Sequence, residues 1–93
     1  MRFEWDAEKA SINQKKHGVT FEEAQTVFGD YDALRIFDPD PSEDEDRFIL
    51  LGMSAVLRIL VVCHCYREND EKIRIISARK ATKKESAAYE RRK

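Results

Sequence analysis

The chain has 93 residues, the size of one small domain, so we expect a single domain over residues 1–93 and exclude a second one. Hydrophobic residues make up 42% of the chain and charged residues 38%, which suits a small core under a charged surface and excludes global disorder. The longest run without a charged side chain, Phe48 to Leu57, has ten residues, whereas a membrane-spanning helix needs about 20. The amino end contains acidic side chains at once and no apolar signal segment. We therefore expect a soluble, cytoplasmic protein with no membrane partner.

The first third of the chain predicts a short strand and two helices, over residues 2–5, 6–16 and 20–29. Asp6 can cap the first helix, because its carboxylate accepts hydrogen bonds from the free amide groups of the first turn. Gly18 follows at the position where many helices end in a left-handed residue. Thr20 and Glu23 fit a capping box at the start of the second helix. That helix carries an apolar stripe at helical spacing, so we expect it to pack on a sheet.

The rest of the chain predicts a sheet and a last helix. The expected strands cover residues 33–37, 47–53, 57–66 and 72–78. Their connections are too short for crossover helices, so neighbouring strands should be antiparallel and form a meander of three to four strands. A second capping box, Thr82 with Glu85, opens a carboxyl-terminal helix with a basic face. The expected fold class is therefore α+β, in two or three layers.

Charge is distributed unevenly along the chain, although the net charge is only −1. Residues 1–71 hold 8 basic and 16 acidic side chains, while residues 72–93 hold 9 basic and 2 acidic ones. A carboxyl end with this charge can contact phosphates of a nucleic acid, or it can be solvated surface. Six acidic residues lie between Asp38 and Asp46, where two prolines oppose regular structure, so we expect an exposed loop there. This loop is a solubilising hairpin tip or a patch for a basic partner.

The two cysteines do not form a disulfide framework. Cys63 and Cys65 lie on the same face of an apolar strand, and His64 between them points to the opposite face, so we expect both thiols to be reduced and buried and no zinc ligand set to form. The glycines stand far apart, which excludes a phosphate-binding loop of the nucleotide-binding folds. We expect no metal and no cofactor.

Cations and one imidazole are concentrated near the carboxyl end; the set is His64, Arg67, Lys72, Arg74, Arg79, Lys80, Lys83 and Lys84. Alternation along residues 57–66 puts Arg58 and His64 on one face of a strand. Arg74 on the next strand shares that face if the register allows, and a basic groove then forms. The following helix presents Glu85 and Tyr89 on one side.

Such a groove suits RNA cleavage without a metal, in which the 2′-hydroxyl attacks the adjacent phosphorus. The reaction needs a proton acceptor, cations for the charge on the phosphorus oxygens and a proton donor for the leaving oxygen. His64, Glu85 or Tyr89 could transfer protons, while Arg74 and Arg79 could bind phosphate through two hydrogen bonds each. Each residue also has a structural interpretation, because His64 suits a half-buried strand position, Arg74 an ion pair and the lysines ordinary surface.

Two blocks of the sequence resemble the BrnT family. Phe3-Glu4-Trp5-Asp6, Lys16-His17-Gly18-Val19 and Phe21-Glu22-Glu23-Ala24 are similar to the start of its members, and the run from Ile73 to Thr82, with Glu85 and Tyr89, is similar to their end. The middle of the family pattern is matched by Arg47, Gly52, Ser54, Arg58 and Tyr66-Arg67. The chain departs from the pattern at Pro41-Ser42, where the family often has His-Ser, and at Leu57, where a glycine commonly precedes the arginine.

The resemblance implies a metal-independent endoribonuclease toxin of a type II toxin–antitoxin system, with a RelE-like α+β fold, that cuts RNA and blocks translation. It implies a ribbon-helix-helix antitoxin similar to BrnA, which binds the toxin and, in complex with it, represses the shared operon, so operator DNA is reached only through that complex. Carried over residue by residue, it implies catalytic roles for Arg58, His64, Arg67, Arg74, Arg79 and Tyr89. RNA contact is carried over to Lys80, Lys83 and Lys84.

Two other functions remain open at this point. The chain could be a non-catalytic module that binds a partner protein and acts in a DNA-bound toxin–antitoxin repressor complex. It could also be a toxin with a different enzymatic target, because one fold supports several functions.

Overall fold

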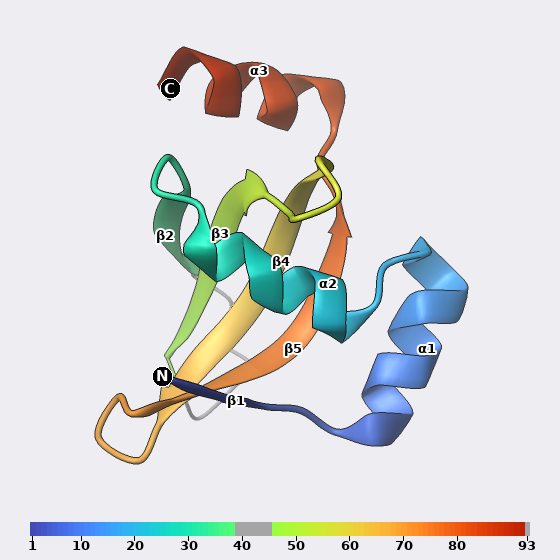
Figure 1. Cartoon of the computed structure of the whole chain (residues 1–93), viewed down its shortest axis with the longest axis vertical. Helices are drawn as coiled ribbons and strands as arrows, with labels where there is room; N and C mark the ends of the chain where they lie inside the picture. The colour runs from blue at the N-terminus through green and yellow to red at the C-terminus, as the bar shows by residue number, and fades with distance from the viewer. Residues whose placement is uncertain (39–45, 93) are drawn as a thin grey trace.

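The computed structural model describes residues 1–38 and 46–92 of the chain (Figure 1). Its strands are β1 (Arg2–Glu4), β2 (Leu34–Asp38), β3 (Arg47–Met53), β4 (Ile59–Arg67) and β5 (Lys72–Lys80). Its helices are α1 (Ala7–His17), α2 (Phe21–Thr26), the short 3-10 helix η1 (Val27–Gly29) and α3 (Lys83–Arg92). The predicted α+β class is confirmed. The predicted acidic loop lies mostly outside the described residues, and none of the described helices is long and apolar enough to cross a membrane.

The sheet is a meander with one strand added at its edge. The strand order is β1-β5-β4-β3-β2, and β2 to β5 are antiparallel neighbours, as the short connections predict. The amino-terminal strand β1 pairs with β5 in parallel, with Phe3 beside Ile73, so the complete sheet is mixed rather than purely antiparallel. This difference arises because the chain enters the sheet at β1, leaves through two helices and returns at the opposite edge (Figure 1).

The helix ends follow the predicted capping residues. The Asp6 carboxylate accepts a hydrogen bond from the Lys9 amide at 3.0 Å, and Gly18 ends α1 in the left-handed conformation with φ of 69°. The second helix, predicted to reach residue 29, is α-helical only to Thr26 and then narrows to a 3-10 turn. The Thr26 hydroxyl donates to the Glu23 carbonyl, a local bond that competes with regular α-helical geometry.

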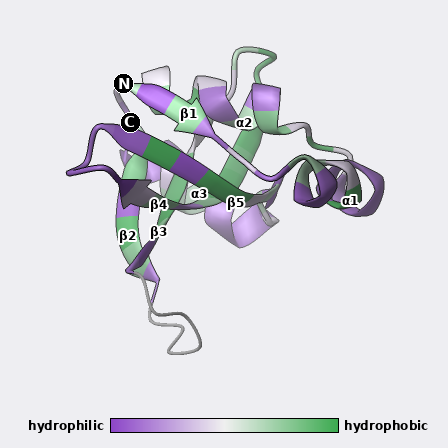
Figure 2. Ribbon diagram, turned by 90° about the horizontal axis from the view of Figure 1, so that it is seen from below, coloured by the Kyte–Doolittle hydropathy of each residue, from purple (hydrophilic) through white to green (hydrophobic). Residues whose placement is uncertain are grey.

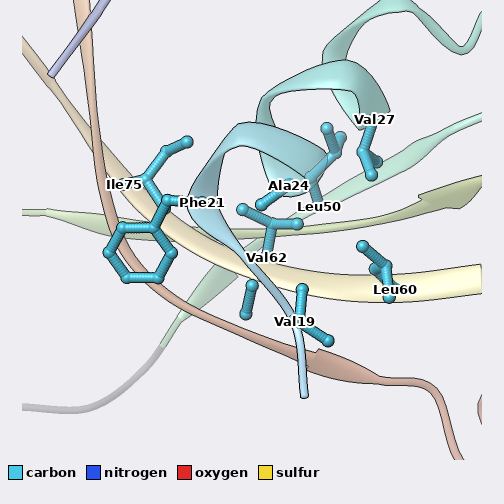
Figure 3. Packing of buried hydrophobic residues seen from close by; sticks show 9 residues of the cluster. Val19, Phe21, Ala24, Val27, Leu50, Leu60, Val62 and Ile75 are labelled. Carbon is cyan, nitrogen blue, oxygen red and sulfur yellow. The ribbon is translucent and has the colours of Figure 1, made fainter. Parts of the chain in front are cut away.

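One face of the sheet is covered by α1, α2 and η1; we call it the covered face, and the opposite side the open face. In Figure 1, α2 crosses in front of β3, β4 and β5. Figure 3 shows how Phe21, Ala24 and Val27 point into the sheet from the helical side. The main core lies there and contains Val19, Phe21, Ala24, Val27, Leu50, Leu60, Val62, Ile75 and Ala78. The open face has a smaller apolar cluster, in which Leu51 and Val61 pack against Tyr89 of α3.

A β-bulge in β5 decides which side chains reach the open face. Cys63 pairs with Ser77, but the next residue, His64, pairs with Ile75, so Ile76 is an extra residue in β5. Side chains alternate along a strand, and one inserted residue reverses the alternation beyond it. Arg74 and Arg79 are five residues apart and would point to opposite faces of a regular strand, yet both lie on the open face. Hydrophobic and hydrophilic residues alternate along β5 in Figure 2.

Leu57 provides a test of the turn between β3 and β4. This residue has φ of 64°, where a leucine side chain is strained, and it is 78% exposed, so it gains little from packing. The left-handed conformation destabilises a folded chain by about 1 to 2 kcal/mol when the residue is leucine. A glycine at the same position avoids this strain, but it loses more conformational entropy on folding, which costs about 0.5 to 1 kcal/mol of free energy. We expect Leu57→Gly to raise the free energy of unfolding by about 0.5 to 1 kcal/mol in denaturant titrations. The matched control is Val56→Gly, at an exposed neighbour without positive φ, and this change should lower the free energy of unfolding. Equal effects of the two changes would contradict the assignment of backbone strain to Leu57.

Candidate functional site

Three cations meet one carboxylate where β1, β4 and β5 meet on the open face. Arg74 Nη1 lies 2.8 Å from Glu4 Oε2, Lys72 Nζ lies 3.4 Å from Oε1, and Arg67 Nε lies 3.8 Å from Oε2. The hydrogen bond from Arg74 is the main reason why the pKa of Glu4 is below its usual value. Three positive charges on one negative charge leave a cationic surplus. We call these four residues the Glu4 cluster.

Arg79 lies farther along β5, at the end of the sheet where α3 begins. Its Nη1 and Nη2 atoms donate to the two Glu85 carboxylate oxygens at 2.8 and 2.9 Å. Glu85 also completes the predicted capping box, accepting from the Thr82 amide at 2.8 Å. The paired guanidinium, and then this amide, lower the pKa of Glu85 to about 2. Both partners are partly exposed, with 41% and 32% of their side-chain surface open, so a dissolved anion can compete for the arginine.

A groove of about 320 Å³ lies beside this ion pair, between the open face and α3. Its sheet side is formed by Ile49, Leu51 and Val61, and its helix side includes Lys84 and Ala88. The groove joins an apolar floor to a basic rim. Such a surface suits a ligand with a flat apolar part and a negatively charged part.

Arg47 is a cation of the open face that the sequence analysis did not assign to the site. Its Nη2 donates to Cys63 Sγ at 3.0 Å, and its Nε lies 3.7 Å from Asp38 Oδ2. Burial raises the pKa of the Cys63 thiol, which keeps it protonated. The predicted burial of Cys63 and Cys65 is confirmed. The sequence contained a signal that could have assigned Arg47 to the open face. Side chains alternate along residues 47–53, and this alternation places Arg47 on the same face as Ile49 and Leu51.

The expectation that His64 shares a face with Arg74 is wrong. Alternation along β4 places His64 on the covered face with Leu60 and Val62, where no part of it is exposed, and the bulge in β5 turns Arg74 to the open face instead. The His64 ring packs against those of Phe28 at 4.8 Å and Tyr66 at 5.4 Å between centroids. Burial lowers the pKa of His64, and its Nε2 atom makes no hydrogen bond within the described residues. The structure therefore gives His64 a packing position that a phosphate cannot reach.

Arg58 and Tyr89 are also held in structural contacts. Arg58 donates to the Glu23 carboxylate from Nε and Nη2 and to the Gly18 carbonyl, which joins the start of β4 to α2. This pairing lowers the pKa of Glu23. Tyr89 is buried and donates from its hydroxyl to Asp30 Oδ2 at 2.6 Å, and burial, followed by this bond, raises its pKa. Neither residue lines the groove beside Arg79.

The three lysines assigned to RNA contact separate into two groups. Lys83 and Lys84 stand exposed at the start of α3, close to Arg79 in sequence, and Lys84 lines the groove. Lys80 pairs with Leu60, a residue of the main core, and therefore points to the covered side. Lys80 therefore does not share a face with Arg79, because side chains alternate along β5.

A larger hollow, of about 690 Å³, lies on the covered side near the β4–β5 turn. Its guanidinium, from Arg35, lies over the rings of Phe48 and Tyr66 at 5.2 and 5.6 Å and donates to the Tyr66 hydroxyl. The lining also includes carboxylates of Asp46 and Asp70, which repel phosphate. Charge therefore favours the open face as the anion-binding surface. Within residues 1–38 and 46–92, no group of three or more His, Cys, Asp or Glu side chains is placed to hold a metal ion.

Comparison with known proteins identifies a family and a similar solved structure. The family model described as "Ribonuclease toxin, BrnT, of type II toxin-antitoxin system" matches residues 5–85. The crystal structure of the Brucella abortus ribonuclease toxin BrnT is similar to this chain with a TM-score of 0.64 and 24% sequence identity, over 89% of this chain and 99% of that one. At this identity the structural match supports the fold alone. No curated protein sequence matches the chain.

The position of His64 predicts a pH dependence of folding. Burial lowers its pKa in the folded chain, whereas the unfolded value is about 6.5, so the unfolded state binds a proton first as the pH falls. The contribution of neutral His64 to stability is therefore complete above about pH 6.5 and is lost as the pH falls toward its folded pKa. We expect His64→Phe to reduce the loss of unfolding free energy between about pH 7 and about pH 5 in denaturant titrations. An unchanged pH slope in this variant would show that His64 is not a buried neutral group.

Proposed function

Because the chain belongs to the BrnT family of ribonuclease toxins of type II toxin–antitoxin systems, we propose that it is an endoribonuclease that cuts RNA on its open face without a metal ion. Cleavage of messenger RNA then arrests translation. The observation that carries the proposal is the placement of Arg67, Arg74 and Arg79 on the open face of the sheet, where Glu4 and Glu85 hold their side chains in defined positions.

The chemistry requires charge stabilisation more than a strong nucleophile. The 2′-hydroxyl oxygen forms a bond to phosphorus, its proton passes to a base, the bond from phosphorus to the 5′-oxygen breaks, and that oxygen takes up a proton. Negative charge grows on the non-bridging oxygens during this exchange. A guanidinium with two parallel donors matches these oxygens, and its permanent charge needs no titration near neutral pH. DNA lacks the 2′-hydroxyl and is not cut.

Arg79 is our assignment for the scissile phosphate. Its two donors are matched by the two Glu85 oxygens in the free chain, and a phosphate presents the same pair of acceptors. Among the three proton-transfer candidates, Glu85 is the one beside an open-face arginine. Its pKa of about 2 makes it a weak base until a phosphate takes over Arg79. We assign RNA contact to Lys83 and Lys84 and not to Lys80.

The antitoxin implied by the family is, in this proposal, a ribbon-helix-helix protein that neutralises the toxin. Operator DNA is then bound through the antitoxin within the complex. The groove beside Arg79 combines apolar side chains with basic ones, which supports a protein segment that carries both apolar and acidic residues as a competitor of RNA. The non-catalytic module is the second candidate, because the same groove would also serve a chain that only binds its partner.

The direct test is incubation of the purified chain with total RNA in excess EDTA. We expect RNA fragments, no cleavage of DNA of the same sequence, and growth arrest when the chain is expressed without the neighbouring open reading frame. Intact RNA at every protein concentration, together with tight binding to the antitoxin, would favour the non-catalytic module. Cleavage only after addition of Mg²⁺ would refute the metal-free mechanism.

Arg79→Ala tests the assignment of the scissile phosphate. Removal of this guanidinium should cost about 2 to 4 kcal/mol of transition-state stabilisation, which is roughly a 30-fold to 1,000-fold loss in kcat. Thermal unfolding should change little, because an ion pair that is this exposed contributes little to stability. The matched control is Arg35→Ala, which removes a guanidinium from the covered side and should leave cleavage unchanged. Equal cleavage by the Arg79→Ala variant and wild type would refute the site.

A further inference from the structure

A row of five residues, four of them charged, crosses all five strands of the open face. Asp38 on β2 pairs with Arg47 on β3, and the register places Arg47 beside Cys65 on β4, one position beyond the pair of Phe48 and His64. Cys65 pairs with Arg74 on β5, which in turn pairs with Glu4 on β1. The row therefore reads acid, arginine, cysteine, arginine, acid from one sheet edge to the other.

The two arginines of this row are fixed from opposite sides. Glu4 binds Arg74 at 2.8 Å from the β1 edge. Asp38 lies 3.7 Å from Arg47 on the β2 side, and Cys63 Sγ accepts from the same guanidinium at 3.0 Å. These contacts hold each guanidinium at a defined place in the free chain, and a phosphate bound between the arginines replaces part of them.

The spacing of the row suits one phosphate. Neighbouring strands are about 4.8 Å apart, so Arg47 and Arg74, two strands apart, have backbones about 10 Å from each other. Two arginine side chains can span this gap with one tetrahedral anion between them. Cys65 between them is only 3% exposed, so it leaves the two arginines as the accessible side chains of this part of the row. The side chains of Arg47 and Arg74 keep 16% and 31% of their surface exposed, so both can be reached from the open face.

The charges around the row favour an anion. Within residues 1–38 and 46–92, Asp38 pairs with Arg47 and Glu4 with Arg74, while Arg67 and Lys72 of the Glu4 cluster add two positive charges. Glu68 forms ion pairs with Lys72 of this cluster and with Arg2, so it adds one negative charge and brings one further positive charge. A phosphate that enters between the arginines therefore meets a positive surplus on the β5 side.

We propose that Arg47 and Arg74 form a two-sided clamp, across Cys65, for one phosphate of single-stranded RNA that flanks the scissile phosphate. The inference rests on the proposed function, because it assigns the scissile phosphate to Arg79. Arg74 and Arg79 are separated along β5 by roughly 13 Å, taking about 3.3 Å for each regular position and leaving out the bulged residue. The clamp and Arg79 thus hold different phosphates of the RNA. The RNA strand between these two phosphates includes at least one further nucleotide.

The first test uses binding of an octanucleotide with 2′-deoxyribose at every position, which cannot be cleaved. We expect Arg47→Ala and Arg74→Ala each to weaken binding about tenfold or more. The double variant should bind only slightly more weakly than the single variant with the lower affinity, because both side chains contact the same phosphate. Arg35→Ala is the control and should bind as wild type does. Normal binding by the Arg47→Ala variant, or losses that multiply in the double variant, would overturn the clamp.

The second test requires no substitution and so does not depend on the folding of a variant. Inorganic phosphate is added to the wild-type chain, and the Nε–Hε signals of its arginines are followed by NMR at constant ionic strength. We expect the Arg47 and Arg74 signals to shift along one binding curve, while the Arg35 signal stays in place. A stationary Arg47 signal, or equal shifts at all three, would refute a specific site.

Cleavage assays separate this inference from the proposed function. On long RNA, Arg47→Ala should raise KM with little change in kcat, whereas on a dinucleotide with a single phosphate it should change neither constant. An equal loss of kcat on both substrates would place Arg47 at the scissile phosphate and overturn the flanking role. If the wild-type chain cleaves no RNA but the binding and NMR results are as expected, the clamp stands and the proposed function fails.

Discussion

The β-bulge at Ile76 is the local feature on which the arrangement of the open face depends. Regular alternation along β5 would place Arg74 and Arg79 on opposite sides of the sheet, and one of them would compete with the packing of α2. The inserted residue brings both to the open face, while Ile75 and Ala78 still reach the core on the covered side. One extra residue therefore allows the apolar side chains of β5 to pack in the core while both arginines lie on the open face.

Each open-face arginine is held by a carboxylate from another part of the chain. Glu4 comes from β1, Asp38 from β2 and Glu85 from α3, so distant segments converge on the strands β3 and β5. The Arg74–Glu4 and Arg79–Glu85 pairs are partly exposed and contribute little to folding. Their main effect is to restrict the guanidinium groups to positions that an incoming phosphate can use. Stability comes instead from the core between α2 and the sheet.

Several residues with functional chemistry are used to build the fold. Asn13 is buried and bonds through its amide to both the Val19 carbonyl and the backbone of Ala78, which fixes α1 on β5. Arg58 joins α2 to the β3–β4 hairpin through Glu23. His64 fills an aromatic part of the interior. Residue type alone does not separate such roles from catalysis, because the same side chain serves either role according to its burial and partners.

The sequence by itself determined the element types, most of their limits and the antiparallel order of β2 to β5, because capping residues, periodicity and loop length act locally. Its match to the family pattern also pointed to the ribonuclease toxins that the family model confirms. Only the tertiary structure decided the parallel partner of β1, the faces of Arg74 and Lys80, the burial of His64 and the role of Arg47. Those outcomes depend on a bulge and on pairings between distant residues. The alternation of side chains along a single strand does not reveal either of these.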